Sequence, residues 1–273
     1  MDTDAPRRGA PGRRPTVAVF YLARGQGERH LDDFATFIAS YRMYPAGYEH
    51  RLYIVFKGFA DDAARKRGEE VFAGVEFDAI ETDDSRFDLG AYADATDRVE
   101  EDVVCFFNTF SEILSPFWLA KLMRNLDSPG VGMVSATGSC ESLAYINRLF
   151  PPFPNPHLRS NAFAMRRRDA LSSFSQFQIA DKLDCFFIES GPDSLTRQMF
   201  GRGLTCLIVG ADGRGFDPGR WPMSGTSRQG TQHNLLVADN FTRQFDAAAA
   251  SFRRECEARS WGRSTPPEIV DAC

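Results

Sequence analysis

The sequence predicts an α/β fold: a single domain in which a mostly parallel central sheet is flanked by helices. Short apolar runs rich in β-branched and aromatic residues alternate with segments of helical periodicity, the pattern of parallel β-α-β units. The length of 273 residues fits one large domain. Hydrophobic residues make up 43% of the chain and charged residues 25%, which excludes a wholly disordered, collagen-like or coiled-coil protein.

The first half carries the regular alternation. Strands are expected at residues 16–23, 51–56, 77–81, 102–107 and 131–135. Helices are expected between them at residues 28–43, 61–71, 89–98 and 116–126. Asp88 is the expected N-cap of the third helix, and Ser115 that of the fourth, with Pro116 at its first position. Five such alternations imply a parallel, doubly wound sheet.

The second half is less regular. In order, we expect a Pro-rich crossover at 149–156, a strand at 160–165, a helix from Arg168, helical residues at 181–201 with a break at Gly191-Pro192, a strand at 204–209, a long functional or mobile loop at 210–230, and a helical stretch at 235–253. The predicted organisation is a disordered tail at 1–15, the domain at 16–245 and a C-terminal helical extension or tail at 246–273.

Composition narrows the functional classes. The 32 Lys and Arg against 37 Asp and Glu give a net charge of −5, which argues against a general nucleic-acid binder. No apolar run approaches the roughly 20 residues that span a bilayer, and the N-terminus lacks an apolar signal region. We therefore expect a cytoplasmic protein without a transmembrane segment, and leave open a peripheral membrane contact and a homodimer. The GxGxxG, Walker A, GxSxG and HExxH motifs are absent.

Ligands of doubly wound sheets bind at the carboxyl ends of the strands, so the polar residues there are the candidates. After the third strand, Asp83, Asp84, Asp88 and Gly90 open a helix, where a sugar hydroxyl or phosphate group docks. The alternative is that Asp88 only caps the helix. Arg24 ends the first strand.

The end of the fourth strand offers oxygen ligands. Asn108 and Glu112 lie at the mouth of the predicted sheet, and amide and carboxylate oxygens suit Mg²⁺ or Mn²⁺ held together with substrate phosphates. The alternative is a turn closed by Ser and Thr hydrogen bonds.

Two further segments carry candidate chemistry. Glu189 lies between an apolar run and a helix break, where partial burial would raise its pKa and suit it to act as a general base; the alternative is a solvated helix glutamate. The long loop and the residues after it supply guanidinium groups that match phosphate geometry, and the alternative is a solvated surface loop. These arginines are Arg214, Arg220, Arg228 and Arg243.

Together these segments resemble glycosyltransferases of the GT-A fold, family 2-like, over residues 16 to about 245. In that family an Asn-x-Gly helix start precedes the fourth strand, and Asp88-Leu89-Gly90 stands there. A DXD-type motif ends the fourth strand; Asn108-Thr109-Phe110 stands in its place, with both aspartates absent and Glu112 as a substitute ligand. The segment 157–167 resembles rhamnan-synthesis and lipopolysaccharide glycosyltransferases.

The resemblance implies a hexosyltransferase that moves a sugar from a nucleotide-sugar donor to a hydroxyl of a polysaccharide, lipopolysaccharide or small-molecule glycoside. Glu189 corresponds to the base of inverting members, which act by direct displacement. His157, Arg159 and Trp221 are the expected acceptor-binding residues, and Asn108, Glu112 and Asp239 the expected ligands of Mn²⁺ or Mg²⁺. The expected donor-binding residues are Arg24, Asp83, Asp84, Asp88, Gly90, Asn108, Arg228 and Arg243.

Three alternatives stay open at this point. A retaining transferase or a nucleotidyltransferase would use the same sheet. A degenerate GT-A domain without activity would instead recognise a glycan or a partner enzyme, and the missing aspartates are the argument for it.

Overall fold

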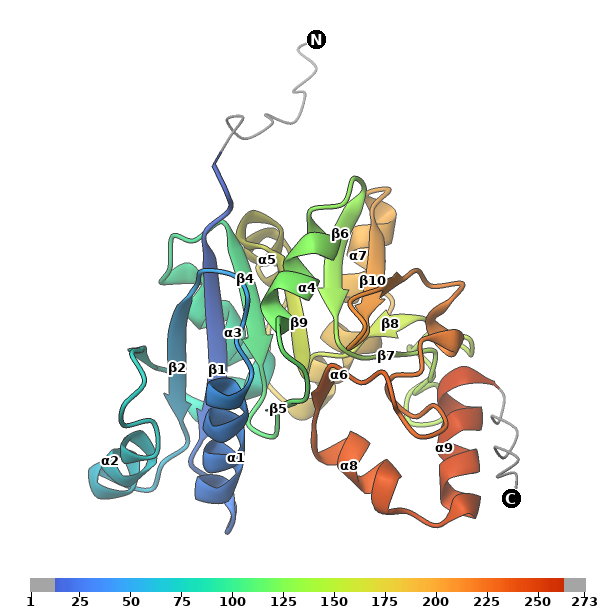
Figure 1. Cartoon of the computed structure of the whole chain (residues 1–273). Coiled ribbons are helices and arrows are strands. Elements are labelled where there is room, and N and C mark those ends of the chain that lie inside the picture. The colour runs from blue at the N-terminus through green and yellow to red at the C-terminus, as the bar shows by residue number, and fades with distance from the viewer. Residues whose placement is uncertain (1–12, 263–273) are drawn as a thin grey trace, which may run out of the picture.

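The computed structural model describes residues 13–262. In this part of the chain an eight-stranded sheet has the order β11-β10-β6-β9-β4-β1-β2-β3 (Figure 1). The strands are β1 (Val17–Arg24), β2 (Arg51–Lys57), β3 (Asp78–Glu81), β4 (Val103–Phe107), β6 (Val131–Ser135), β9 (Ala162–Arg166), β10 (Thr205–Val209) and β11 (Gly215–Phe216). Most neighbouring pairs are parallel, and the predicted α/β fold with a mostly parallel sheet is confirmed.

The sheet departs from a purely parallel one at two strands. β9 runs antiparallel between β4 and β6, and β11 runs antiparallel at the edge beside β10. The fourth and fifth strands of the predicted alternation therefore do not pair with each other. A strand from the second half of the chain lies between them.

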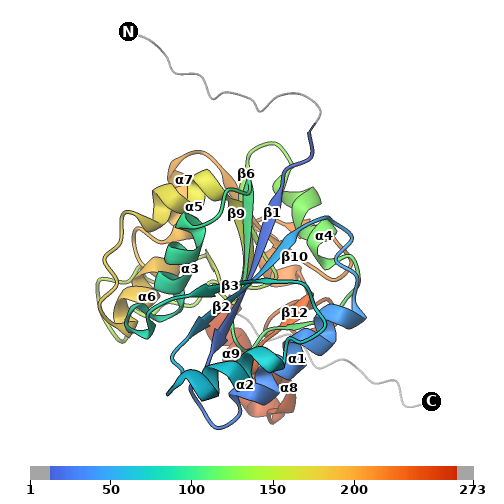
Figure 2. The same ribbon diagram turned by 90° about the vertical axis from the view of Figure 1, so that its left-hand side faces the viewer.

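Helices cover both faces of the sheet (Figure 2). On one face lie α1 (His30–Met43), α2 (Asp62–Glu70) and α4 (Trp118–Leu126); on the other lie α3 (Phe87–Asp97), α5 (Arg167–Phe174), α6 (Lys182–Ser190) and α7 (Leu195–Gly201). Alternate residues of β1 serve the two cores: Val19 and Tyr21 pack under α1, and Phe20 and Leu22 pack toward α3. Burial on both faces explains why β1 is continuously apolar.

Two short strand pairs lie outside the main sheet. β7 (Gly138–Ser139) pairs with β8 (His157–Leu158), and β5 (Glu112–Ile113) pairs with β12 (Val237–Ala238), which brings the C-terminal part of the chain to the end of β4. Helices α8 (Asn240–Ala247) and α9 (Ala250–Trp261) follow. The predicted helical stretch at 235–253 is thus a short strand and two helices, and the predicted domain boundary at 245 falls inside α8.

Helix α9 packs against the domain. Trp261 belongs to the core on the α3 face, and the Ser260 carbonyl accepts a hydrogen bond from the Cys140 amide at 2.8 Å. Most of the predicted tail at 1–15, and residues 263–273 of the predicted extension, lie outside the described residues. None of the helices in residues 13–262 combines the length and the apolarity needed to cross a bilayer.

Two helix starts differ from the predictions. A 3₁₀ turn at Asp84–Arg86 precedes α3, so Arg86 takes the N-cap position and Asp88 lies in the first helical turn. Helix α4 begins at Trp118, after Phe117, which has φ of 59° and donates its amide to the Pro45 carbonyl. The predictions that Asp88 and Ser115 cap these helices were wrong. The 3₁₀ turn starts α3 one residue before Asp88, and α4 starts only after Phe117, whose amide is held by the Pro45 carbonyl.

Candidate active site

The loops that follow β1, β2 and β3 meet around one carboxylate, that of Asp84. Arg24 donates through Nε and Nη2 to its two oxygens, each at 3.0 Å. Lys57 Nζ lies 3.2 Å from Oδ1, and Gln26 Nε2 lies 2.7 Å from Oδ2. Burial raises the pKa of Asp84, but the bonds from Arg24 and Lys57 outweigh it and hold the pKa below its ordinary value. Asp84 is therefore ionised and connects the three loops through Arg24, Gln26 and Lys57. We call these four residues the Asp84 brace.

Lys57 is the buried side of this brace. Its side chain is fully buried at the end of β2, and Nζ also donates to the Phe87 carbonyl at 2.6 Å. Burial lowers the pKa of Lys57, and the bond to Asp84 opposes that shift. The next residue, Gly58, has φ of 66°, and a Cβ there would lie 3.0 Å from the Asp84 side chain, so the turn requires glycine.

The other predicted donor-side residues lie around the start of α3. Asp83 accepts a hydrogen bond from the Ser85 amide at 2.5 Å, and the Asp88 carboxylate lies 4.0 Å from Lys182 Nζ of α6. Gly90 is buried, and a Cβ there would collide with the Arg86 side chain. Close packing of the Arg86 side chain thus explains why this residue is glycine. The sequence analysis had instead interpreted Gly90 as a position where the backbone approaches a phosphate group.

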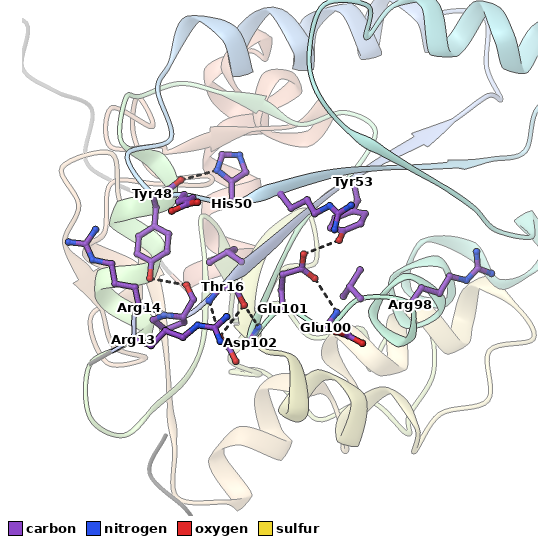
Figure 3. Close-up of a pocket in the computed structure, with 15 residues that line it drawn as sticks. Arg13, Arg14, Thr16, Tyr48, His50, Tyr53, Arg98, Glu100, Glu101 and Asp102 are labelled. Atoms are coloured by element: carbon purple, nitrogen blue, oxygen red, sulfur yellow. Dashed lines mark hydrogen bonds between the residues drawn. The ribbon is translucent and has the colours of Figure 1, made fainter. Parts of the chain in front are cut away.

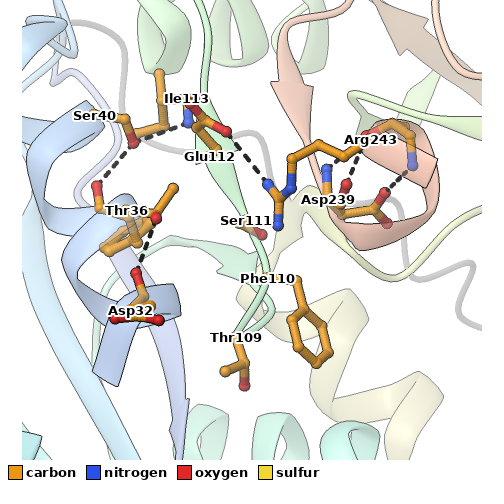
Figure 4. Close-up of polar contacts among 12 residues, drawn as sticks. Asp32, Thr36, Ser40, Thr109, Phe110, Ser111, Glu112, Ile113, Asp239 and Arg243 are labelled. Atoms are coloured by element: carbon orange, nitrogen blue, oxygen red, sulfur yellow. Dashed lines mark hydrogen bonds and ion pairs between the residues drawn. The ribbon is translucent and has the colours of Figure 1, made fainter. Parts of the chain in front are cut away.

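The three predicted metal ligands come from segments that the β5–β12 pairing brings together, and each has a structural partner. Asn108 Oδ1 accepts from the Phe110 amide at 3.1 Å and from Ser111 Oγ at 2.9 Å, which is the turn that was the alternative interpretation. Glu112 pairs with Arg243 at 3.3 Å (Figure 4). Asp239 caps α8 by accepting from the Thr242 amide at 2.8 Å.

In this arrangement the three side chains do not fit a divalent cation. Residues 13–262 contain no group of three His, Cys, Asp or Glu side chains that could hold a metal ion. Hard cations need several oxygen ligands that converge on one point, and here the carboxylates point to a guanidinium and a helix end. Arg243 was predicted to bind the donor, and in the structure its guanidinium is paired with Glu112.

On the other side of the β4 end lies the carboxylate of Glu189, in the last turn of α6. Its Oε2 accepts two hydrogen bonds from Ser160, from the amide at 2.8 Å and from Oγ at 2.5 Å. Oε1 makes no hydrogen bond to the described part of the chain. Burial raises the pKa of Glu189, but Arg159, His157 and the Ser160 bonds outweigh it and hold the pKa below its ordinary value. The predicted raised pKa was wrong, because the sequence does not show the cation and the donors that face this carboxylate.

The two predicted acceptor residues of the 157–159 segment lie beside Glu189. His157 is buried, and its Nδ1 donates to the Asn155 carbonyl at 2.8 Å, which leaves Nε2 without a proton in the neutral ring. Burial lowers the pKa of His157. The guanidinium of Arg159 stands 5.3 Å from the centre of the Phe241 ring.

Trp221 and Arg228 are placed differently from the predictions. Trp221 is fully buried, and its indole N–H donates to the Phe216 carbonyl at 2.9 Å, so it is a core residue and not an acceptor contact. Arg228 pairs with Glu141 at 3.0 Å and reaches Ser260 Oγ of α9 at 3.2 Å. The bond to Ser260 links the 210–230 loop to α9, and the ion partner of Arg228 is Glu141, not Asp84.

Sequence reasoning missed several residues that the structure brings to this edge. The sequence analysis assigns no role to Ser160, Phe241 or Glu141. It assigns none to Lys57 either, the residue that follows the predicted strand at 51–56. A lysine that ends an otherwise apolar buried strand was the available signal for the brace, because such a cation requires a carboxylate partner.

A cavity of about 960 Å³ lies at the opposite end of the sheet, where β1, β2 and β4 begin (Figure 3). Its polar groups largely satisfy one another: Tyr53 donates to Glu101 at 2.9 Å, and the Thr16 amide donates to Asp102 at 2.9 Å. Because ligands of such sheets bind at the carboxyl ends, we take the opposite edge, with Asp84 and Glu189, as the candidate active site.

No protein-family model matches the chain, and no curated protein matches it. Among solved structures it is similar to a mannosyltransferase from Pyrobaculum calidifontis in complex with GDP-Man and Mn²⁺ (17% identity, 72% of this chain, 55% of that chain, TM-score 0.47). It is also similar to glucosyl-3-phosphoglycerate synthase from Mycobacterium tuberculosis with Mn²⁺ and UDP (14% identity, 57% of this chain, 58% of that chain, TM-score 0.39). A third is CMP:2-keto-3-deoxy-manno-octonic acid synthetase with CTP (13% identity, 70% of this chain, 88% of that chain, TM-score 0.42).

This chain thus spans little more than half the length of the first two structures. At these identities and TM-scores the likenesses assign no activity to it.

Proposed function

We propose that this chain is a glycosyltransferase that moves a sugar from a nucleotide-sugar donor to a hydroxyl of an acceptor, with Glu189 as the general base. One observation carries the proposal. Glu189 is held at the carboxyl edge of the sheet by Ser160 through one oxygen only, and its lowered pKa keeps it ionised at neutral pH. The oxygen without a hydrogen bond is then able to accept a proton.

The reaction is a direct displacement. Glu189 Oε1 takes the proton of the acceptor hydroxyl as its oxygen forms a bond to the anomeric carbon. The bond from that carbon to the diphosphate breaks, and the nucleoside diphosphate leaves with the electron pair, which inverts the configuration. Arg24, the exposed carboxylate of Asp83 and the half-buried carboxylate of Asp88 frame the donor, and the ion pairs of Asp84 hold the loops that carry them.

The finer assignments follow the family resemblance. They are hexosyl transfer, a polysaccharide, lipopolysaccharide or small-molecule glycoside as acceptor, and a cytoplasmic location. The Mn²⁺ or Mg²⁺ that the resemblance also implies does not fit Asn108, Glu112 and Asp239 with the partners they have here. The partners that Asn108, Glu112 and Asp239 already have favour one second candidate, a GT-A-like module that binds a glycan without turnover.

The test compares Glu189→Gln with Glu49→Gln. Glutamine at 189 keeps an acceptor for Ser160 but cannot take the proton, so we expect turnover to fall by roughly 10²- to 10⁴-fold, the usual contribution of a general base. Nucleoside-diphosphate affinity stays unchanged. Glu49→Gln, an exposed residue at the opposite end of the sheet, retains full activity. Turnover of Glu189→Gln at the wild-type rate would remove Glu189 from the mechanism.

A further inference from the structure

Arg159 lies in a rigid segment between β8 and β9. Its amide donates to the Thr137 carbonyl at 3.2 Å, and its carbonyl accepts from Ser135 Oγ at 3.1 Å. The next residue, Ser160, holds Glu189. The backbone that presents Arg159 is therefore the same backbone that positions the proposed base.

The guanidinium of Arg159 makes no hydrogen bond and no ion pair with the described part of the chain. The guanidinium carbon lies 5.3 Å from the centre of the ring of Phe241, a residue that is 45% exposed in the first turn of α8. Burial lowers the pKa of Arg159, but the charges of Glu189, Asp239 and Glu141 outweigh it and raise the pKa. The cation is thus held near carboxylates that it does not contact.

Those carboxylates have donors of their own. Glu189 accepts from Ser160, Asp239 accepts from the Thr242 amide, and Glu141 pairs with Arg228 and Arg259. The other arginines along this edge are paired as well: Arg24 with Asp84, Arg228 with Glu141, and Arg243 with Glu112. Arg159 therefore differs from these arginines. Its main chain is held by hydrogen bonds, but the N–H groups of its guanidinium have no hydrogen-bond partner in residues 13–262.

We propose that Arg159 binds an anionic group, a phosphate or a carboxylate, on the acceptor. The planar guanidinium matches both groups with two parallel hydrogen bonds, and the adjacent exposed Phe241 ring offers an apolar face to the ring that carries the group. Ser160, the residue after Arg159, holds Glu189, so an acceptor whose hydroxyl faces Glu189 would present its anionic group to Arg159. The inference rests on the proposed function and adds the charge of the acceptor to it.

The same chemistry could come from the donor, whose diphosphate also carries phosphate groups. The experiment therefore has two arms. In the first, isothermal titration calorimetry measures the affinity for one neutral sugar, glucose, and for two anionic sugars, glucuronate and glucose 6-phosphate. In the second, it measures UDP and GDP. Both arms use the wild type, Arg159→Gln, and Arg51→Gln, which removes a paired, exposed arginine at the far end of the sheet.

We expect the wild type and Arg51→Gln to bind at least one anionic sugar more tightly than glucose. Arg159→Gln should lose roughly ten- to hundredfold of that affinity, the range for a lost charge-assisted hydrogen-bond pair, and should bind the nucleoside diphosphates as the wild type does. A loss confined to UDP or GDP would move Arg159 to the donor diphosphate and overturn the proposal. Equal affinity for glucose and both anionic sugars would also overturn it.

If Arg159→Gln does not fold, Arg159→Lys carries the test. It keeps the charge but loses the fork, so weaker anionic-sugar binding supports the proposal and unchanged binding contradicts it. The outcome is separable from that of the glycosyltransferase assignment. Absence of turnover with retained, Arg159-dependent anion binding would refute only the assignment, whereas turnover on neutral acceptors that is unaffected by Arg159→Gln would refute only this inference.

Discussion

At the scale of single residues, the environment of Glu189 decides its chemistry. Burial alone would favour the protonated carboxyl group, which could not act as a base. Two hydrogen bonds from Ser160 and the charge of Arg159 reverse that preference and lower its pKa. When protonated, the ring of His157 also lowers the pKa of Glu189, although burial lowers the pKa of His157 itself.

The lowered pKa of Glu189 predicts a pH dependence of stability. A carboxylate with a pKa lower in the folded state than in the unfolded state adds stability above the unfolded value, and that stability is lost as the pH falls through the folded value. We therefore expect the free energy of unfolding of the wild type to drop as the pH falls below 4.5, the ordinary value. Glu189→Gln should show a shallower drop in urea unfolding at several pH values. Identical slopes for the two proteins would contradict the assigned environment.

At the scale of elements, α6 carries the proposed base and is fixed at both ends. A capping box starts it: the Asp184 amide donates to Asp181 at 3.0 Å, and the Asp181 amide donates to the Asp184 carboxylate at 3.1 Å. Near the other end, the ring of Phe187 stacks on Phe150 with centroids 4.3 Å apart. The helix is nine residues long, so a change at its start is transmitted to Glu189 over little more than two turns.

We predict that Asp181→Ala lowers both stability and turnover. Loss of an N-cap costs about 1 kcal/mol, and a frayed first turn loosens the helix that carries Glu189. Asp61→Ala is the matched control, because Asp61 caps the surface helix α2 through the Ala64 amide at 2.6 Å. It should lose similar stability in thermal unfolding and keep full kcat. An equal loss of kcat in both variants would show that α6 has no special role.

At the scale of the whole molecule, the sequence predicts the elements better than their pairing. The buried strands β1, β2 and β4 are apparent because each is a short apolar, β-branched or aromatic run. The insertion of antiparallel β9 between β4 and β6 is not, because hydrophobic periodicity carries no information on which strand pairs with which. Helix starts shift for a related reason: a distant contact, such as that of Phe117 with Pro45, fixes a left-handed residue before α4.

For the candidate site, too, the sequence predicts the location better than the contacts of each side chain. The rule that ligands bind at strand carboxyl ends points to Arg24 and to the 83–84 segment, and the structure joins them. The sequence does not reveal that Asp84 is already neutralised by Arg24 and Lys57, or that Trp221 lies in the core. Which side chain turns inward depends on tertiary packing, and residue type alone does not determine it.

The central claim is that this edge of the sheet binds a nucleotide sugar. The most direct measurement is thermal unfolding with UDP-, GDP-, dTDP- and CMP-sugars, each with Mn²⁺ and with EDTA. We predict that one nucleotide class raises Tm by about 5–10 °C at a concentration about 100-fold above its Kd. A shift lost in EDTA would show that a divalent cation takes part in donor binding, and a shift that survives EDTA would show that the chain binds the donor without one. No shift with any nucleotide sugar at any metal concentration would contradict the account.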